Sequence, residues 1–168
     1  ETLFVARTRK YKVGPKLDED CDMGPMITEG EAKRTERWIA EAVDLGATVA
    51  CGGRRVGALL EPTVLENVPA EATIHHQEVF GPTVNLYPVD DLDQAIAAAN
   101  SVDYGLHAAA FSRDVATCHR LIDGLDAGSV LINDSTDYRL DSMPFGGIKK
   151  SGLGREGIRF SLAEMTEP

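Results

Sequence analysis

The sequence predicts an α/β fold, a parallel β-sheet with helices on both faces in a three-layer αβα arrangement. In the second half of the chain, strand-like runs at residues 83–89, 107–111 and 129–133 alternate with helical patterns at 91–100 and 114–123. The turns between them are short. Strands that alternate with helices in this way form βαβ units, in which the helix crosses between two parallel strands.

The clearest helix is predicted at residues 28–45. Thr28 and Glu31 have the spacing of a capping box, and Ile27 with Ala32 that of a hydrophobic staple. Residues at helical spacing are expected to form its buried stripe: Ala32, Thr35, Ile39, Ala42 and Val43. A helix tail at 1–13, a strand at 47–50 and an extended segment at 61–68 complete this half of the chain.

The two later helices show the same amphipathic pattern. Asp91 and Gln94 cap the first, and Gly124 ends the second. Their inward faces are predicted to be Leu92, Ala95, Ile96 and Ala99 in the first helix, and Val115, Cys118, Leu121 and Ile122 in the second. The strand at residues 107–111 between them is expected to be buried.

The chain has 168 residues, the size of one domain, and a formal net charge of −10. This acidity argues against nucleic acid as a partner, because phosphates require a basic surface, and against an anionic membrane surface. No apolar run approaches the length of a membrane span. Glu1 in place of an initiating Met indicates a piece of a longer protein.

Cysteine and histidine usage predicts neither a disulfide framework nor a metal site. Cys21, Cys51 and Cys118 are an odd and widely spaced set, typical of free thiols in a reducing compartment, and we expect a cytoplasmic protein. His75 and His76 are adjacent and cannot share one face of a helix or strand. We expect them to be surface residues.

The most informative stretch of the sequence is residues 144–157. It holds five glycines, and only glycine adopts positive φ or lets another backbone come close without steric cost. Ile158, Leu162 and Met165 then recur on one face of a helix. The pattern predicts a shaped loop that leads into a short helix. A flexible linker would repeat Gly and Ser without Phe, Lys, Arg and Glu at particular places.

A second stretch far upstream is Gln77-Glu78-Val79-Phe80-Gly81-Pro82. At these two stretches the sequence resembles the C-terminal part of the NAD(P)-dependent aldehyde dehydrogenases. Further matches occur in family order at Asp22-Met23-Gly24-Pro25-Met26-Ile27, Gly52-Gly53, Glu61-Pro62-Thr63-Val64-Leu65, Asp103-Tyr104-Gly105-Leu106 and Ile132-Asn133. One such motif is weak evidence, whereas seven in order over nearly the whole chain are strong.

The resemblance implies an oxidoreductase that converts an aldehyde to a carboxylic acid with NAD or NADP. In the family a cysteine thiolate attacks the carbonyl, hydride passes to the nicotinamide, and water hydrolyses the thioester. The family pattern places that cysteine, the general-base glutamate and the dinucleotide-binding domain N-terminal to the residues matched here. Residues 1–168 are therefore expected to be an incomplete catalytic domain, inactive alone, from a protein that is a homodimer or homotetramer.

The resemblance also implies roles for single residues. Glu78 matches the glutamate that holds the nicotinamide ribose, and an ionised carboxylate can accept hydrogen bonds from both vicinal hydroxyls. Phe80 matches the aromatic beside the nicotinamide. Phe145 matches a residue at the base of the aldehyde tunnel. Glu156 matches an acidic residue implicated in proton relay behind the active site; an ion pair or a helix N-terminal role is the alternative.

The loop at residues 134–143 lies where the family varies to select substrates. Its form resembles the branch that includes lactaldehyde, glyceraldehyde-3-phosphate and phosphonoacetaldehyde dehydrogenases. Arg139 could pair with a substrate phosphate, phosphonate or carboxylate through its planar guanidinium. The alternative is a salt bridge to Asp137 or Asp141. A rival to the enzyme hypothesis is a non-catalytic binding or assembly module derived from this domain.

Overall fold

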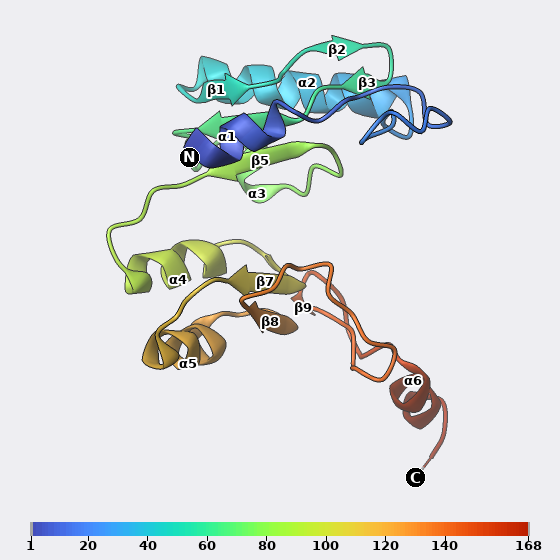
Figure 1. Cartoon of the computed structure of the whole chain (residues 1–168). Helices are drawn as coiled ribbons and strands as arrows, with labels where there is room; N and C mark the ends of the chain where they lie inside the picture. The colour runs from blue at the N-terminus through green and yellow to red at the C-terminus, as the bar shows by residue number, and fades with distance from the viewer. Residues whose placement is uncertain (1, 168) are drawn as a thin grey trace. The chain divides into compact units, whose positions relative to one another are not determined.

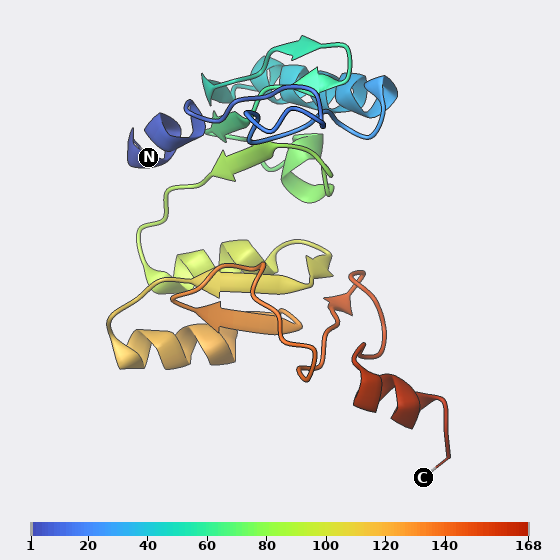
Figure 2. The same ribbon diagram turned by 45° about the vertical axis from the view of Figure 1, so that its right-hand side comes forward.

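The computed structural model describes residues 2–167, and the chain divides into two compact units, Glu1–Pro88 and Val89–Pro168 (Figures 1 and 2). The first unit contains the elements α1 (Thr2–Thr8), α2 (Glu29–Asp44), β1 (Thr48–Cys51), β2 (Arg55–Val56), β3 (Leu59–Leu60), β4 (Thr63–Glu66), α3 (Thr73–His76) and β5 (Thr83–Leu86). The second contains α4 (Leu92–Asn100), β6 (Tyr104–Gly105), β7 (His107–Ala110), α5 (Val115–Gly124), β8 (Ser129–Ile132), β9 (Ile148–Lys149) and α6 (Ile158–Glu164).

Each unit contains one pair of parallel strands, and the fold is of the α/β class as predicted. The predicted βαβ unit from residues 83–89 to 107–111 does not form, because β5 and β7 belong to different sheets. In the first unit β4 pairs with β5 in parallel, and the connection between them contains α3. In the second unit β7 pairs with β8 in parallel, with α5 as the crossover helix. The predicted helix tail at residues 1–13 is shorter, because α1 ends at Thr8; Glu1 lies outside the described residues.

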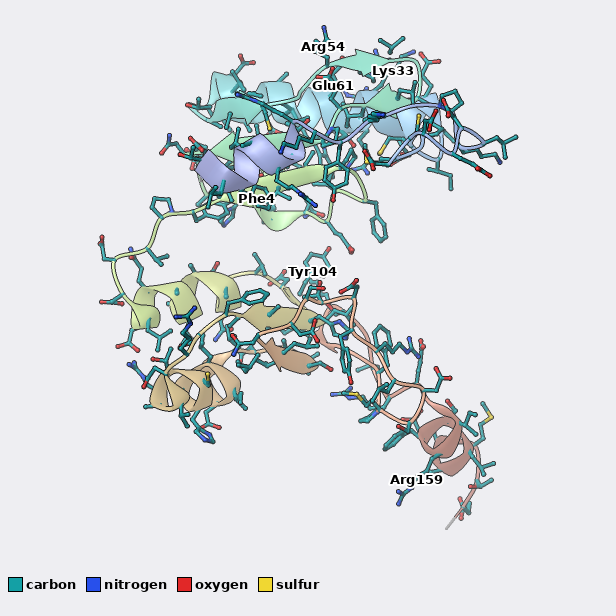
Figure 3. All side chains as sticks on the ribbon, viewed as in Figure 1. Phe4, Lys33, Arg54, Glu61, Tyr104 and Arg159 are labelled. Atoms are coloured by element: carbon teal, nitrogen blue, oxygen red, sulfur yellow. The ribbon has the colours of Figure 1, made fainter. Side chains whose placement is uncertain are left out.

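The first unit also has an antiparallel edge that the sequence did not predict. Its sheet has the order β1-β4-β5, and β1 runs antiparallel to β4. The short link between them holds the β2–β3 hairpin and no helix, whereas parallel neighbours need a longer crossover. Arg54 and Glu61 close this hairpin, with Nε and Nη2 of Arg54 donating to Glu61 Oε1 at 2.9 and 2.8 Å (Figure 3).

The core of the first unit lies between α2, β4 and α3. Its buried members are Ile39, Ala42, Ala47, Leu65, Val68, Ala72 and Ile74. The predicted N-cap of α2 is confirmed, since Thr28 Oγ1 accepts a hydrogen bond from the Glu31 N–H at 3.1 Å. The buried stripe is confirmed for Ala32, Thr35, Ile39 and Ala42.

Two predictions at the edges of α2 are wrong. Ile27 is 90% exposed, so it forms no staple with Ala32. Its neighbour Met26 instead lies against Gly81, and the Met26 N–H donates to Ala58 O at 2.9 Å. Val43 is 42% exposed because it lies at the margin of the buried stripe.

The second unit is less buried than its apolar patterns predicted. Leu121 is buried on α5, but Val115 and Ile122 are 69% and 47% exposed, and Ala99 on α4 is exposed. Phe111, predicted to end a buried strand, is 74% exposed. On α6 the face formed by Ile158, Leu162 and Met165 is also exposed. Periodicity identifies an apolar face, but burial needs a second surface against it.

Among residues 2–167 the cysteines form no disulfide bond. Cys21, Cys51 and Cys118 are free thiols, and Cys51 is buried. His76 is exposed, while His75 Nδ1 lies 2.8 Å from the hydroxyl of Tyr87. Across residues 2–167 no helix is long and apolar enough to cross a membrane, and no group of three or more His, Cys, Asp or Glu could hold a metal ion.

Candidate functional site

The residues predicted to contact a cofactor lie on one turn between α3 and β5. This Glu78–Pro82 turn is fixed by main-chain hydrogen bonds where it enters β5: Thr63 N–H donates to Pro82 O and Thr83 N–H to Gly81 O, both at 2.8 Å. Phe80 has φ of +51°, a left-handed conformation that a bulky residue rarely adopts. Such a conformation persists only where its surroundings impose it.

Glu78 and Phe80 both project from this turn. The Phe80 ring is 79% exposed, and Glu78 is exposed as well. An exposed aromatic ring beside an exposed carboxylate on a strained turn is a poor arrangement for stability, because the ring gains nothing from burial. It is a suitable arrangement for holding a ligand with both an aromatic ring and hydroxyl groups.

A second group of predicted site residues comes together in the other unit. The guanidinium of Arg139 lies over the ring of Phe145, with Cζ 4.2 Å from the ring centroid. Arg139 Nη2 also lies 3.7 Å from Glu156 Oε2. Phe145 and Glu156 are held together by reciprocal main-chain hydrogen bonds of 3.0 and 2.6 Å. We call these three residues the Arg139–Phe145–Glu156 cluster.

The ion-pair alternative for Arg139 is therefore only partly right. Its acidic partner is Glu156, not Asp137 or Asp141. Asp137 is engaged locally, as an acceptor from the hydroxyl of Ser135. The Arg139 and Glu156 side chains are 44% and 72% exposed, and an ion pair in water contributes little to stability. Both charged groups thus remain accessible to a ligand.

The glycine-rich loop that carries Phe145 and Glu156 is shaped as predicted. It pairs with residues 104–105 through β9, and Gly152, Gly154 and Gly157 have positive φ. Lys149 Nζ donates to the carbonyl oxygens of Asn100 and Val102 at 2.9 and 3.2 Å. A hydrogen bond from Lys150 lowers the pKa of the Asp103 carboxyl and, reciprocally, raises the pKa of Lys150.

A pocket of about 450 Å³ opens along this loop. Phe145, Glu156 and Arg155 contribute to its lining, together with backbone of the glycines. Arg155 is engaged in holding the loop, because its Nη1 donates to the carbonyl oxygens of Gly147 and Gly154 at 3.1 and 2.7 Å. Arg155 therefore links the carbonyl groups of Gly147 and Gly154 on the glycine-lined side of the pocket.

Two residues that carry no motif in the sequence lie against these groups. His107, at the start of β7, packs edge-on against Phe145 with ring centroids 5.0 Å apart, and its Nδ1 lies 2.9 Å from Thr136 O. Arg34, on α2, donates from Nη2 to Val79 O at 2.7 Å. Neither is detectable from local sequence, since each contact joins segments far apart in the chain.

Comparison with known proteins identifies the family. The chain matches the model of the aldehyde dehydrogenase family over residues 2–168, and it belongs to that family. It is 49% identical over 165 residues to a putative aldehyde-dehydrogenase-like protein of Sinorhizobium fredii, covering 98% of this chain and 32% of that protein. It is 44% identical over 161 residues to the 3-sulfolactaldehyde dehydrogenase of Priestia aryabhattai, covering 96% of this chain and 34% of the relative.

A solved structure agrees with these relatives. Glyceraldehyde-3-phosphate dehydrogenase GapN from Methanocaldococcus jannaschii, complexed with NADP, has a TM-score of 0.93 and 39% identity, covering 99% of this chain and 36% of that chain. The family predicted from the motifs is thereby confirmed. The chain spans about a third of the length of the curated relatives it matches.

Proposed function

We propose that this chain is the catalytic-domain segment of an NAD(P)-dependent aldehyde dehydrogenase. The observation that carries the proposal is the Glu78–Pro82 turn, on which a member of this family keeps an exposed carboxylate and an exposed ring in a strained conformation. The dinucleotide-binding domain and the nucleophilic cysteine are assigned to other parts of a longer protein. This assignment agrees with the share of the relatives that the chain covers.

The roles of the two turn residues follow from their chemistry. The Glu78 carboxylate accepts hydrogen bonds from both hydroxyls of the nicotinamide ribose. The Phe80 ring packs beside the nicotinamide and excludes water from that side. Bound NAD or NADP supplies the hydride acceptor. The NADP complex of the similar glyceraldehyde-3-phosphate dehydrogenase supports this class of cofactor.

The Arg139–Phe145–Glu156 cluster favours an aldehyde with a negative group at its far end. Arg139 presents an exposed guanidinium over Phe145, and its planar fork suits a sulfonate, phosphate or carboxylate. Phe145 offers an apolar surface to the substrate chain. Two of the similar proteins are named for 3-sulfolactaldehyde and glyceraldehyde 3-phosphate, which are aldehydes of this kind. Glu156 remains a candidate for proton relay, with its ion pair to Arg139 as the competing role.

The test of the enzyme hypothesis uses the complete protein that carries this chain. With a suitable aldehyde it should produce NADH or NADPH, whereas residues 1–168 alone should be inactive. Glu78→Gln should raise the dinucleotide KM about 10-fold, because a charge-assisted hydrogen bond is lost. Glu71→Gln, at an exposed position of the same unit, is the matched control. A reading frame without the family cysteine, and no turnover of any aldehyde, would favour the assembly module instead.

The test of the anion site compares two substrates. Arg139→Gln should lower kcat/KM for an anionic aldehyde about 10- to 100-fold and change that for a neutral aldehyde of equal length less than about 3-fold. An equal loss for both substrates would show that Arg139 supports the loop and does not contact the anion. We further assign the protein to the cytoplasm, in line with its free thiols, and expect a homodimer or homotetramer, which light scattering can test.

A further inference from the structure

Arg34 connects α2 with the Glu78–Pro82 turn. Its Nε donates to Glu31 Oε2 at 2.7 Å, its Nη2 donates to Val79 O at 2.7 Å, and its Cζ lies 4.2 Å from the ring centroid of Trp38. The side chain is 23% exposed. Glu31 and Trp38 lie three and four residues away on the same helix, so both can face Arg34. The guanidinium is thus held on two sides by its own helix while it reaches across to the turn.

The Val79 carbonyl, to which Arg34 donates, sets the peptide plane that precedes Phe80. Val79 lies between Glu78 and Phe80, and its carbonyl oxygen shares a peptide plane with the Phe80 N–H. Holding that oxygen fixes the plane, and so the direction in which the chain enters the left-handed conformation of Phe80, with φ of +51°. Released from this bond, a bulky residue tends to return to negative φ.

The other end of the turn is held by the same helix. A Cβ atom at Gly81 would lie 3.2 Å from Met26 Cε and 3.4 Å from Thr35 Oγ1. Gly81 is therefore packed closely against Thr35 of α2 and against the residue that precedes the helix. Because α2 fixes both sides of Phe80, the helix acts as the support for the two exposed side chains.

We propose that Arg34 is a positioning residue for the dinucleotide site. It fixes the Val79 carbonyl and thereby the directions of Glu78 and Phe80. The inference rests on the proposed function, since it assumes that these two side chains contact the nicotinamide nucleoside. Arginine suits the task because its rigid fork donates to Glu31 and Val79 at once, whereas a lysine ammonium is a point charge on a flexible stem.

The experiment compares Arg34→Lys and Arg34→Gln with Arg37→Gln in the complete protein. Arg37 is exposed on the same helix and serves as the matched control. Each Arg34 variant should raise the dinucleotide KM about 10-fold and leave the aldehyde KM within about 2-fold of wild type. Arg37→Gln should change neither. In the complete protein, hydrogen exchange of the segment that carries Phe80 and Gly81 should be faster in the Arg34 variants and unchanged in Arg37→Gln.

The outcomes separate this inference from the proposed function. Arg34 variants that lower the unfolding midpoint but leave the dinucleotide KM at the wild-type value would overturn the positioning role. So would Arg34→Lys with wild-type kinetics, because lysine lacks the fork. If Glu78→Gln raises the dinucleotide KM while Arg34→Gln does not, only the inference about Arg34 fails. If neither variant affects the dinucleotide, the assignment of the turn itself fails.

Discussion

Gly128→Ala tests whether the glycine-rich loop depends on close contact between backbones. Gly128 precedes β8, and its N–H donates to Gly105 O at 3.0 Å. A Cβ atom at this position would overlap the carbonyl oxygen of Gly146, and it would lie 2.8 Å from the Gly146 carbonyl carbon and 3.0 Å from Gly147 Cα. All three obstacles are backbone atoms, so no change of side-chain rotamer can relieve the overlap.

The magnitude follows from these distances. Carbon atoms in contact prefer separations of about 3.5–4.0 Å, so the Gly146 carbonyl carbon and Gly147 Cα would have to move by about 0.5–1 Å, and the overlapping Gly146 oxygen by more. Overpacking of this kind costs about 1–3 kcal/mol. For a chain of this size, the unfolding midpoint should fall by about 2–12 °C. The displacement should also reach Phe145, which directly precedes Gly146 and is hydrogen-bonded to Glu156 through its main chain.

The assay is thermal unfolding followed by circular dichroism, with amide hydrogen exchange at Phe145 and Glu156 as the local readout. Gly30→Ala is the control, because the same methyl group would lie 3.6 Å from Thr28 Oγ1 within α2. There we expect stabilisation by about 0.5–1 kcal/mol. A midpoint for Gly128→Ala at or above the wild-type value, with unchanged exchange at Phe145 and Glu156, would show that the loop does not depend on this backbone contact.

Three further predictions concern stability. Thr28→Ala should lower the free energy of unfolding by about 1 kcal/mol in urea titrations, since the Glu31 N–H loses its cap, and Thr28→Ser should retain most of it. Leu65→Ala should cost about 2–5 kcal/mol, because Leu65 is fully buried; a smaller loss would mean that the core collapses around the gap. Hydrogen bonds from the hydroxyl and N–H of Thr117 lower the pKa of Asp114. This cap therefore stabilises α5 above the ordinary pKa of aspartate, and its contribution should vanish as pH falls through the lowered value. The measurement is the amide chemical shift of Thr117 as a function of pH, which should follow the titration of Asp114. In Asp114→Asn this pH dependence should be absent.

Interactions between residues close together in the chain could be predicted from the sequence. The predicted helix caps at Thr28 and Asp91 are present as hydrogen bonds from the N–H groups three residues on. Caps and periodicity depend on neighbours within one helical turn, which the sequence specifies directly. The family motifs were readable for a related reason, because backbone conformations such as those of Gly154 and Gly157 restrict the residue type.

Burial depended on the tertiary structure. The apolar patterns of α5 and α6 predict faces correctly, yet Val115 and Ile158 are 69% and 85% exposed. Whether such a face is covered depends on surfaces distant in the chain, on which periodicity carries no information. The antiparallel direction of β1 could not be predicted for the same reason, because strand pairing depends on segments that are distant in the chain.

The candidate site also has features that the sequence predicts and features that depend on the folded chain. The sequence shows which residue types are available: the carboxylate and ring of the Glu78–Pro82 turn, the glycine-rich loop, and the charge of Arg139. That Arg139 pairs with Glu156, and that Arg34 donates to the Val79 carbonyl, is visible in the folded chain alone. These contacts join residues separated in the chain by 17 and 45 positions. A side chain's chemistry is a local property, whereas its partner is set by how the whole chain packs.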